Sequence, residues 1–354
     1  MSHPLFELAN DRAVRQAAEF RDKAAELTGE SLAAAFASER SSAPRLSEAG
    51  RNYFVKRSGK PATERRKNKE EEHLGSALVR ACRESGTGIA LPEEAGELRI
   101  LDYQVRVKTG SVDDPATKGI SRIDLLGVGP DDRLAVVKLR YVEPAATRCR
   151  VGDTPLRMLL DGLAYTAIAA ANRDEIAAEI AERFGHTLSD EPPHCMLLAS
   201  PRYWELCRKR AVQKGATWIK ELERLAQEIG DSLSVPIHFL GLALEGDLGW
   251  SYAEDGPKLD GDPRLKIAWE PGAGRVRPKP KPRARPRQDP ADAIVEADLS
   301  RPVRPYAFAD SYTAGDRIDH PKLGTGVVQG LAGPGKIRVH FDERKSVLVH
   351  ERSA

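Results

Sequence analysis

Apolar and polar residues alternate in three stretches of the central part of the chain, and this two-residue period is typical of half-buried β-strands. The three stretches are residues 98–108, 120–128 and 134–142. The turn-forming sequence Gly-Pro-Asp-Asp at 129–132 separates the last two, which predicts a hairpin. Ahead of them, apolar residues recur at spacings of three and four and predict a helix over residues 70–84.

Further elements follow the hairpin in a regular order. Apolar residues at helical spacing run from Leu156 to Ala167, with Asp153 or Thr154 as the N-cap and Pro155 in the first turn. The later elements are a strand at 194–199, a helix built on Trp218, Leu222, Leu225 and Ile229, and a strand at 236–245. The order helix, three strands, helix, strand, helix, strand predicts an α/β or α+β fold with one central mixed sheet flanked by helices.

The two ends of the chain differ from the central domain, which we place at residues 51–270. Residues 1–50 are rich in alanine and charged side chains and predict one or two helices of unassigned purpose. In the linker, 271–310, basic residues alternate with prolines; such a stretch cannot bury a core and favours extended polyproline II conformations. Residues 311–354 regain strand alternation in short pieces separated by glycines, which predicts a small all-β module.

The composition argues against a chain embedded in a membrane. Of the 354 residues, 31% are charged, and the longest apolar stretches, such as 156–171, fall short of the roughly 20 residues that a bilayer span needs. The first residues contain acidic side chains and no apolar run of signal-peptide type. The cysteines Cys82, Cys149, Cys195 and Cys207 lack the paired spacing of a zinc site. We therefore expect a cytoplasmic protein with buried free thiols.

The predicted hairpin carries a set of polar residues in the sequence GISRIDLLGVGPDDRLAVVKLRY, residues 119–141. This sequence resembles the core hairpin of PD-(D/E)XK nucleases, in which glycine-x-x-arginine-x-aspartate is followed by a turn, an apolar strand and acidic-x-lysine. In those enzymes two carboxylates hold a divalent metal ion that activates water, and the lysine positions or deprotonates that water. The resemblance implies a restriction-endonuclease-like fold.

The resemblance fails at two of the three catalytic positions. Asp124 matches the first carboxylate, but Lys138 stands where the second acid is expected and Arg140 where the lysine is expected. Replacing a carboxylate with an ammonium changes the local charge by two units, and each unit is worth about 1–4 kcal/mol at about 4 Å. We therefore expect a degenerate centre without a metal cofactor, in which the Lys138 ammonium takes the place of the metal ion beside Asp124.

An alternative keeps catalysis through a carboxylate that has moved. Glu70, Glu71 or Glu72 could supply it from the predicted helix; Glu71 projects towards the sheet, so it could hold Mg²⁺ together with Asp124. Glu143 is a weaker candidate, because its odd offset from Lys138 places it on the opposite face of the strand. Under this alternative the chain is a metal-dependent phosphodiester hydrolase, and the sequence leaves open whether it is an enzyme.

Loss of cleavage does not imply loss of binding, because phosphate contacts need only positive charge and reach. We expect Arg122, Lys138 and Arg140 to lie in or beside a nucleic-acid cleft. In the following helix, Arg157 and Asp161 are expected at the surface. The linker adds further candidate nucleic-acid contacts: Arg275, Arg277, Lys279, Lys281, Arg283, Arg285 and Arg287.

The last segment, AGDRIDHPKLGTGVVQGLAGPGKIRVHFDERKSVLVHER at 314–352, has its own resemblance. Through 315–318, 320–328 and 337–342 it resembles the Tudor-like module that ends UvrD/PcrA-type bacterial helicases, and it is similar to the polymerase-interacting module of CarD-type regulators. The resemblance implies a small SH3/Tudor-like barrel that docks onto RNA polymerase or a repair helicase. Residues expected to fill its core are Ile318, Val327, Ile337, Val339, Phe341 and Val347.

Together these patterns favour a bacterial-type, nucleic-acid-associated protein, a pseudo-nuclease of DNA repair or transcription, that binds without cutting. The alternatives are an Mg²⁺-dependent endonuclease or exonuclease and an adaptor that binds only protein. ATP use is not supported, because no Gly-Lys-Ser/Thr phosphate loop occurs. The spacing of His194, Cys195 and Cys207 does not favour a metal site.

Overall fold

The computed structural model describes residues 3–55, 60–109, 120–209, 216–270, 294–342 and 344–351. The chain divides into two compact units, Met1–Arg277 and Pro278–Ala354. None of the helices that the structure describes combines the length and the apolar character that crossing a membrane requires.

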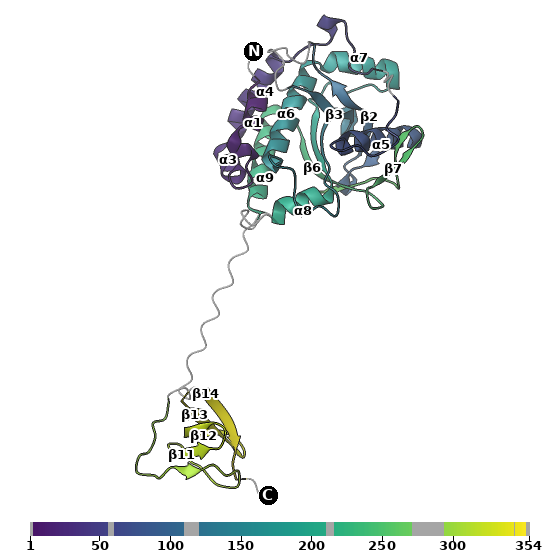
Figure 1. The fold of residues 1–354 in the computed structure, drawn as a ribbon. Coiled ribbons are helices and arrows are strands. Elements are labelled where there is room, and N and C mark those ends of the chain that lie inside the picture. Colours follow the sequence, from purple (N-terminus) through teal and green to yellow (C-terminus); the bar gives the residue numbers. More distant parts are fainter. Residues whose placement is uncertain are drawn as a thin grey trace. The chain divides into compact units, whose positions relative to one another are not determined.

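The first unit is built on a seven-stranded mixed sheet with the order β1-β2-β3-β4-β5-β6-β9 (Figure 1). Strands β1 to β4 pair antiparallel, β4, β5 and β6 run parallel, and β9 is antiparallel to β6. The strands are β1 (Ile89–Ala90), β2 (Glu97–Arg106), β3 (Arg122–Val128), β4 (Leu134–Arg140), β5 (His194–Ala199), β6 (Ile237–Ala243) and β9 (Arg264–Ile267). The five strands predicted from the sequence are all present, and their ends differ by at most two residues.

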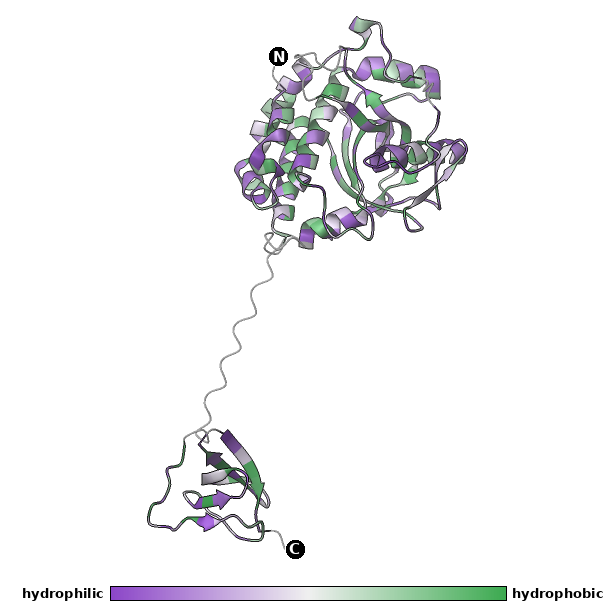
Figure 2. Cartoon of the chain, in the orientation of Figure 1, coloured by the Kyte–Doolittle hydropathy of each residue, from purple (hydrophilic) through white to green (hydrophobic). Residues whose placement is uncertain are grey.

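Helices cover both faces of this sheet. Helix α6 (Pro155–Ala171) packs on one face, and α5 (Glu70–Ser85) packs on the other beside the hairpin of β7 (Trp250–Ala253) and β8 (Gly256–Leu259). Strand β4 is therefore buried along its whole length, and Figure 2 shows the apolar interior between the layers.

The start of α6 and its approach to the sheet follow from particular side chains. The Thr154 hydroxyl accepts a hydrogen bond from the backbone N–H of Arg157, so Thr154, one of the two predicted caps, is the N-cap. Gly162 allows α6 to approach β5 closely, because a Cβ there would lie 2.7 Å from a methyl carbon of Leu197.

Four short helices at the N-terminus belong to the same core. They are α1 (Pro4–Asn10), α2 (Arg12–Arg15), α3 (Phe20–Glu26) and α4 (Gly29–Ser41). They pack against α6 and α9 (Trp218–Leu233) and bury Phe6, Phe20 and Phe36. The sequence predicted one or two helices here and assigned them no structural role. In the structure the four helices cover the side of α6 that faces away from the sheet. Helices α7 (Arg173–Phe184) and α8 (Pro201–Lys209) were not predicted.

The second unit is a five-stranded sheet with the order β10-β11-β12-β13-β14. Its strands are β10 (Arg304–Pro305), β11 (Arg317–His320), β12 (Gly324–Gly333), β13 (Lys336–Phe341) and β14 (Arg344–Val349). Ile318, Ile337, Val339 and Phe341 are buried as predicted. Two core predictions are wrong: Val328 takes the buried position expected for Val327, and Val347 is 57% exposed because its side of the edge strand β14 has no covering layer.

Candidate functional site

The first contact of the predicted centre is an ion pair between two neighbouring strands. Asp124 lies in β3 and Lys138 in β4, and the Lys138 Nζ is 3.0 Å from Asp124 Oδ2. The same oxygen accepts a hydrogen bond of 3.1 Å from the backbone N–H of Leu139. Both side chains are almost fully buried, 10% and 13% exposed. The ammonium of Lys138 thus lies directly against the carboxylate that the nuclease resemblance assigns to metal binding.

Arg140, two residues along β4, is surrounded by carboxylates from four elements. Its Nε is 2.8 Å from Asp153 Oδ1, just ahead of α6, and its Nη2 is 3.4 Å from Asp161 Oδ2, within α6. Its Nη1 lies 3.7 Å from Glu71 Oε2, in the first turn of α5, and 3.9 Å from Asp124 Oδ2. These residues form what we call the central cluster: Glu71, Asp124, Lys138, Arg140, Asp153 and Asp161.

The central cluster holds four carboxylates against two cations in a buried setting. Burial opposes the charged form of Arg140, but the carboxylates of Asp153, Glu71, Asp124 and Asp161 outweigh it and hold the pKa of Arg140 well above its ordinary value. Burial raises the pKa of Glu71, and the attraction of Arg140 offsets this only in part. Glu71 therefore takes up a proton at a higher pH than an ordinary glutamate does.

The central cluster does not fit a divalent metal ion. Mg²⁺ requires several oxygen ligands that face a common point without a competing cation. Here Asp124 and Glu71 both face Arg140, and Lys138 lies within hydrogen-bonding distance of Asp124. Among the described residues no group of three His, Cys, Asp or Glu side chains is arranged to hold a metal ion. Lys138 and Arg140 occupy the space next to the carboxylates that such an ion would need.

The other acidic residues considered for a migrated ligand lie at the rim of the central cluster. Glu70 Oε2 is 3.2 Å from Arg150 Nη2, and Glu70 Oε1 is 3.6 Å from Arg65 Nη2. Glu143 also pairs with Arg65. Both arginines are about half exposed. Glu70 and Glu143 are thus engaged by rim arginines, and Glu71 is the acidic residue of this group that reaches Arg140.

Two surface expectations are wrong. Asp161 is 8% exposed and faces Arg140, and Arg157 is only 26% exposed, with its Nε 3.9 Å from Asp161 and its Nη1 donating to the carbonyl of Gly152. No local pattern indicated this burial, because a single arginine and a single aspartate at helical spacing are typical of a solvated helix face.

The predicted nucleic-acid contacts separate into three groups in the structure. Lys138 and Arg140 are 8% and 9% exposed and paired with carboxylates, so neither presents a free charge to a phosphate. Arg122 is exposed, at the start of β3, and lines a large groove. The seven basic residues between 275 and 287 lie outside the described residues. The contact role predicted for Lys138 and Arg140 is therefore not supported by their geometry.

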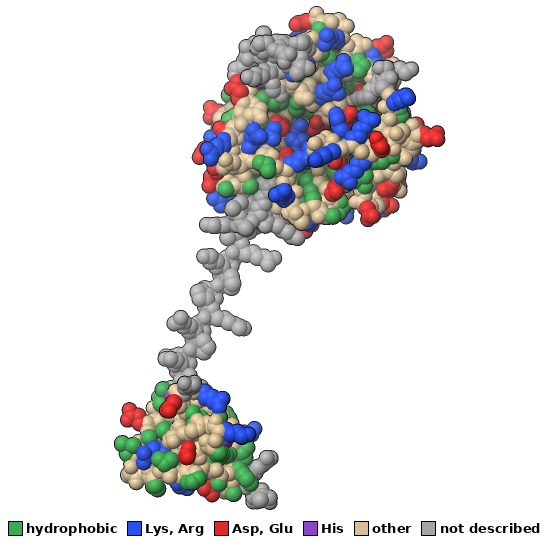
Figure 3. All heavy atoms as spheres, viewed as in Figure 1, with side chains coloured by type: hydrophobic (Ala, Val, Ile, Leu, Met, Phe, Trp, Pro, Cys, Tyr) green, Lys and Arg blue, Asp and Glu red, His purple; other side chains and the backbone are tan. Residues whose placement is uncertain are grey.

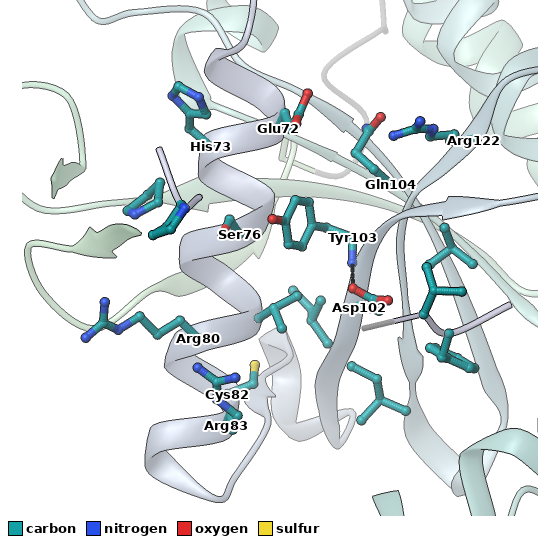
Figure 4. Close-up of a pocket in the computed structure, with 18 of the residues that line it drawn as sticks. Glu72, His73, Ser76, Arg80, Cys82, Arg83, Asp102, Tyr103, Gln104 and Arg122 are labelled. Carbon is teal, nitrogen blue, oxygen red and sulfur yellow. Dashed lines mark hydrogen bonds between the residues drawn. The ribbon is translucent and has the colours of Figure 1, made fainter. Parts of the chain in front are cut away.

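The groove lined by Arg122 runs along α5 and β2 and has a volume of about 1280 Å³. We call it the α5 groove. Figure 4 shows Tyr103 of β2 and Ser76 of α5 facing each other within it, with Gln104 and Arg122 at one end. His73 and Arg80 lie on the opposite side of α5 in the same view, so the groove borders the helix on both sides.

Positive charge dominates the α5 groove. Nine Lys or Arg side chains line it, against three carboxylates, and Figure 3 shows basic side chains gathered over one face of the first unit. Lys69, Arg80, Arg99 and Arg183 have salt-bridge partners. Within the described part of the chain, the other five have no carboxylate within salt-bridge distance and are exposed: Lys60, Arg66, Arg83, Arg106 and Arg122.

The cysteines and histidines considered for a metal site lie apart or pair otherwise. Cys195 is fully buried against the α6 side of the sheet, and Cys207 lies 3.9 Å from Cys149, sulfur to sulfur. His194 faces His238, with 3.0 Å between their ring nitrogens. These contacts place His194, Cys195 and Cys207 in three separate settings.

No family model, no curated protein and no solved structure matches the chain. The nuclease and Tudor-like resemblances therefore rest on the residues of the chain itself, and the functions that follow from them are proposals.

Proposed function

We propose that the chain is a nucleic-acid-binding protein whose first unit derives from a PD-(D/E)XK nuclease and does not cut. The observation that carries this proposal is the pairing of Lys138 and Arg140 with Asp124 and Glu71 in the central cluster. Positions that resemble a metal-dependent centre are here neutralised by fixed cations. Helix α5, the antiparallel strands β2, β3 and β4, helix α6 and the parallel strand β5 surround the central cluster in this order along the chain, with β1 before β2 and α7 before β5, and this order supports the same derivation.

Binding is assigned to the α5 groove because polyanions are held by positive charge that has no competing internal partner. Five cations of the groove meet that condition within the described part of the chain, whereas Lys138 and Arg140 do not. The basic linker, 275–287, is proposed as a second, sequence-independent contact through counterion release. The second unit is proposed as a docking module for RNA polymerase or a repair helicase, on its resemblance alone.

The competing candidate is an Mg²⁺-dependent endonuclease or exonuclease that uses Asp124 and Glu71. One observation favours it: both carboxylates lie within 4 Å of the same nitrogen of Arg140, so movement of that side chain would leave two acids side by side. Against it stands the ammonium of Lys138, which remains beside Asp124.

A cleavage assay distinguishes the two candidates. We expect the purified full chain to leave supercoiled plasmid, linear duplex and single-stranded substrates intact at millimolar Mg²⁺ or Mn²⁺, because Asp124 and Glu71 of the central cluster both lie against cations. The Asp124→Asn variant should behave identically. Metal-dependent cleavage that is abolished by Asp124→Asn but kept by Asp131→Asn, a change in the exposed β3–β4 turn, would establish the nuclease instead.

A further inference from the structure

We infer that the ligand of the α5 groove is single-stranded nucleic acid, held by its phosphates at Arg106 and Arg122 and by its bases against Tyr103. This inference rests on the proposed nucleic-acid function and adds the class of ligand and the contact residues.

The phosphate contact is indicated by two arginines that face each other and that pair with no carboxylate among the residues that the structure describes. Arg106 ends β2 and Arg122 begins β3, and the two are directly opposite in the antiparallel register. Like charges in opposite positions of neighbouring strands destabilise a sheet. Both side chains are exposed, and neither has a carboxylate within salt-bridge distance among the described residues. A phosphate between them would remove this repulsion and accept hydrogen bonds from both guanidinium groups.

The backbone beside these arginines is also strained. Gln104 has a φ of 48°, in the left-handed region that glutamine rarely adopts, although it lies inside β2. Its side chain projects into the end of the groove that Arg122 lines (Figure 4). Strained residues that persist within a regular strand often lie at binding sites. The strain therefore indicates a site at the same end of the groove as the arginine pair.

Tyr103 and the shape of the groove favour a single strand over a duplex. The half-buried ring of Tyr103 lies between α5 and β2, with Ser76 facing it (Figure 4). A duplex keeps the flat faces of its bases stacked inside, so an aromatic ring has nothing to stack on; a single strand offers every base face. Proteins that bind single strands without sequence preference combine a positively charged groove that follows the nucleic-acid backbone with aromatic side chains on which bases stack. The α5 groove combines such positive charge with the half-buried ring of Tyr103.

The test compares ligands and variants in the full chain by fluorescence anisotropy. The labelled probes are a mixed-sequence oligonucleotide of about 20 nucleotides as DNA or RNA, longer than single-strand sites of ~4–16 nucleotides, and the same DNA as a duplex. We expect the single strands to bind about ten-fold or more tightly than the duplex. The DNA and RNA probes show which sugar the groove prefers.

Charge-reversal variants locate the site. Arg106→Glu/Arg122→Glu should weaken single-strand binding about ten-fold or more and lower the salt dependence of log Kd by about 1 to 2. The matched control, Arg40→Glu/Lys220→Glu, changes the net charge equally on exposed positions of α4 and α9 and should bind like the parent. Tyr103→Leu should weaken binding roughly five-fold or more. Arg106→Gln/Arg122→Gln serves if the glutamates impair folding, as judged by circular dichroism.

Each result separates the inference from the proposed function. Equal or tighter binding of the duplex would overturn the single-strand assignment and leave nucleic-acid binding in place. Single-strand binding that survives both arginine variants but is lost on deleting 275–287 would move the site from the α5 groove to the linker. Failure of all probes to bind would overturn the proposed function itself.

Discussion

Replacing Arg140 with methionine is expected to lower the free energy of unfolding of the first unit by about 3–5 kcal/mol, because the change leaves buried carboxylates without their cation. Arg140 contacts Asp153, Asp161 and Glu71 and is 9% exposed, so little water can take the place of the guanidinium. Urea unfolding followed by far-UV circular dichroism measures the loss.

The matched control for this prediction is Arg150→Met. Arg150 is 53% exposed and contacts Glu70 at the rim, and exposed ion pairs contribute about 0–1 kcal/mol. The two variants remove the same guanidinium and add the same side chain. The difference between their losses in the free energy of unfolding therefore measures the effect of burial and of the number of carboxylate partners. Equal losses in the two variants would show that the carboxylates of the central cluster do not depend on Arg140.

The loss caused by Arg140→Met should grow with pH. Without the guanidinium, the pKa of the buried Glu71 carboxyl in the folded chain would rise further above its unfolded value, so the folded state would bind more protons and lose stability as the pH rises. In the parent, Arg140 counteracts the burial that raises the pKa of Glu71. We therefore expect a larger deficit at pH 8 than at pH 5. A deficit that is independent of pH would mean that the loss comes from packing alone.

The sheet could be predicted from the sequence because its strands carry strong local signals. Strand β4 is covered on both faces and begins with the apolar run from Leu134 to Val137, and the turn at 129–132 marks where β3 ends. The N-terminal helices gave a weaker signal, since α1, α2 and α3 are seven residues or shorter and cannot repeat a helical pattern. Their burial depends on α6 and α9, which lie far away in the sequence.

Only those members of the central cluster could be predicted whose positions follow from the spacing of the nuclease motif and its preceding helix. Asp124, Lys138, Arg140 and Glu71 were expected near one another, and the structure brings all four together. Asp153 and Asp161 join them because α6 begins beside the end of β4, and no local pattern reports that juxtaposition. A carboxylate becomes buried only when a cation meets it, so its own sequence neighbourhood cannot reveal it.

The α5 groove was missed because its cations come from separate segments. Arg83 lies in the last turn of α5, Arg106 ends β2, and Arg122 begins β3. Residues 50–69 form a basic stretch in the sequence, and two of its cations, Lys60 and Arg66, line the groove. The two aromatic residues of this stretch are Tyr53 and Phe54. Aromatic residues in a basic stretch are typical of a stacking surface, but these two are 2% exposed and pack in the hydrophobic core.

A second large effect is expected at the pair of His194 and His238, which should make the first unit sensitive to mild acid. His194 Nδ1 lies 3.0 Å from His238 Nε2, and His194 Nε2 lies 3.3 Å from the carbonyl oxygen of Pro130. Burial, then His238 and Arg133, lower the pKa of His194 to about 4, although Asp131 acts in the opposite direction. Burial and Arg133 also lower the pKa of His238. Both rings are therefore held neutral in the folded chain.

The sign of the effect follows from the unfolded chain, where a histidine titrates near pH 6.5. As the pH falls below 6.5, the unfolded state takes up a proton that the folded state does not bind. The free energy of unfolding therefore decreases from about pH 6.5 down to about pH 4. For His194 alone the loss between pH 7 and pH 5 amounts to about 2 kcal/mol. Urea unfolding at the two pH values measures it. His194→Gln should reduce this dependence, whereas His186→Gln, which leaves the pair intact, should keep it; an unchanged dependence in His194→Gln would contradict the assignment.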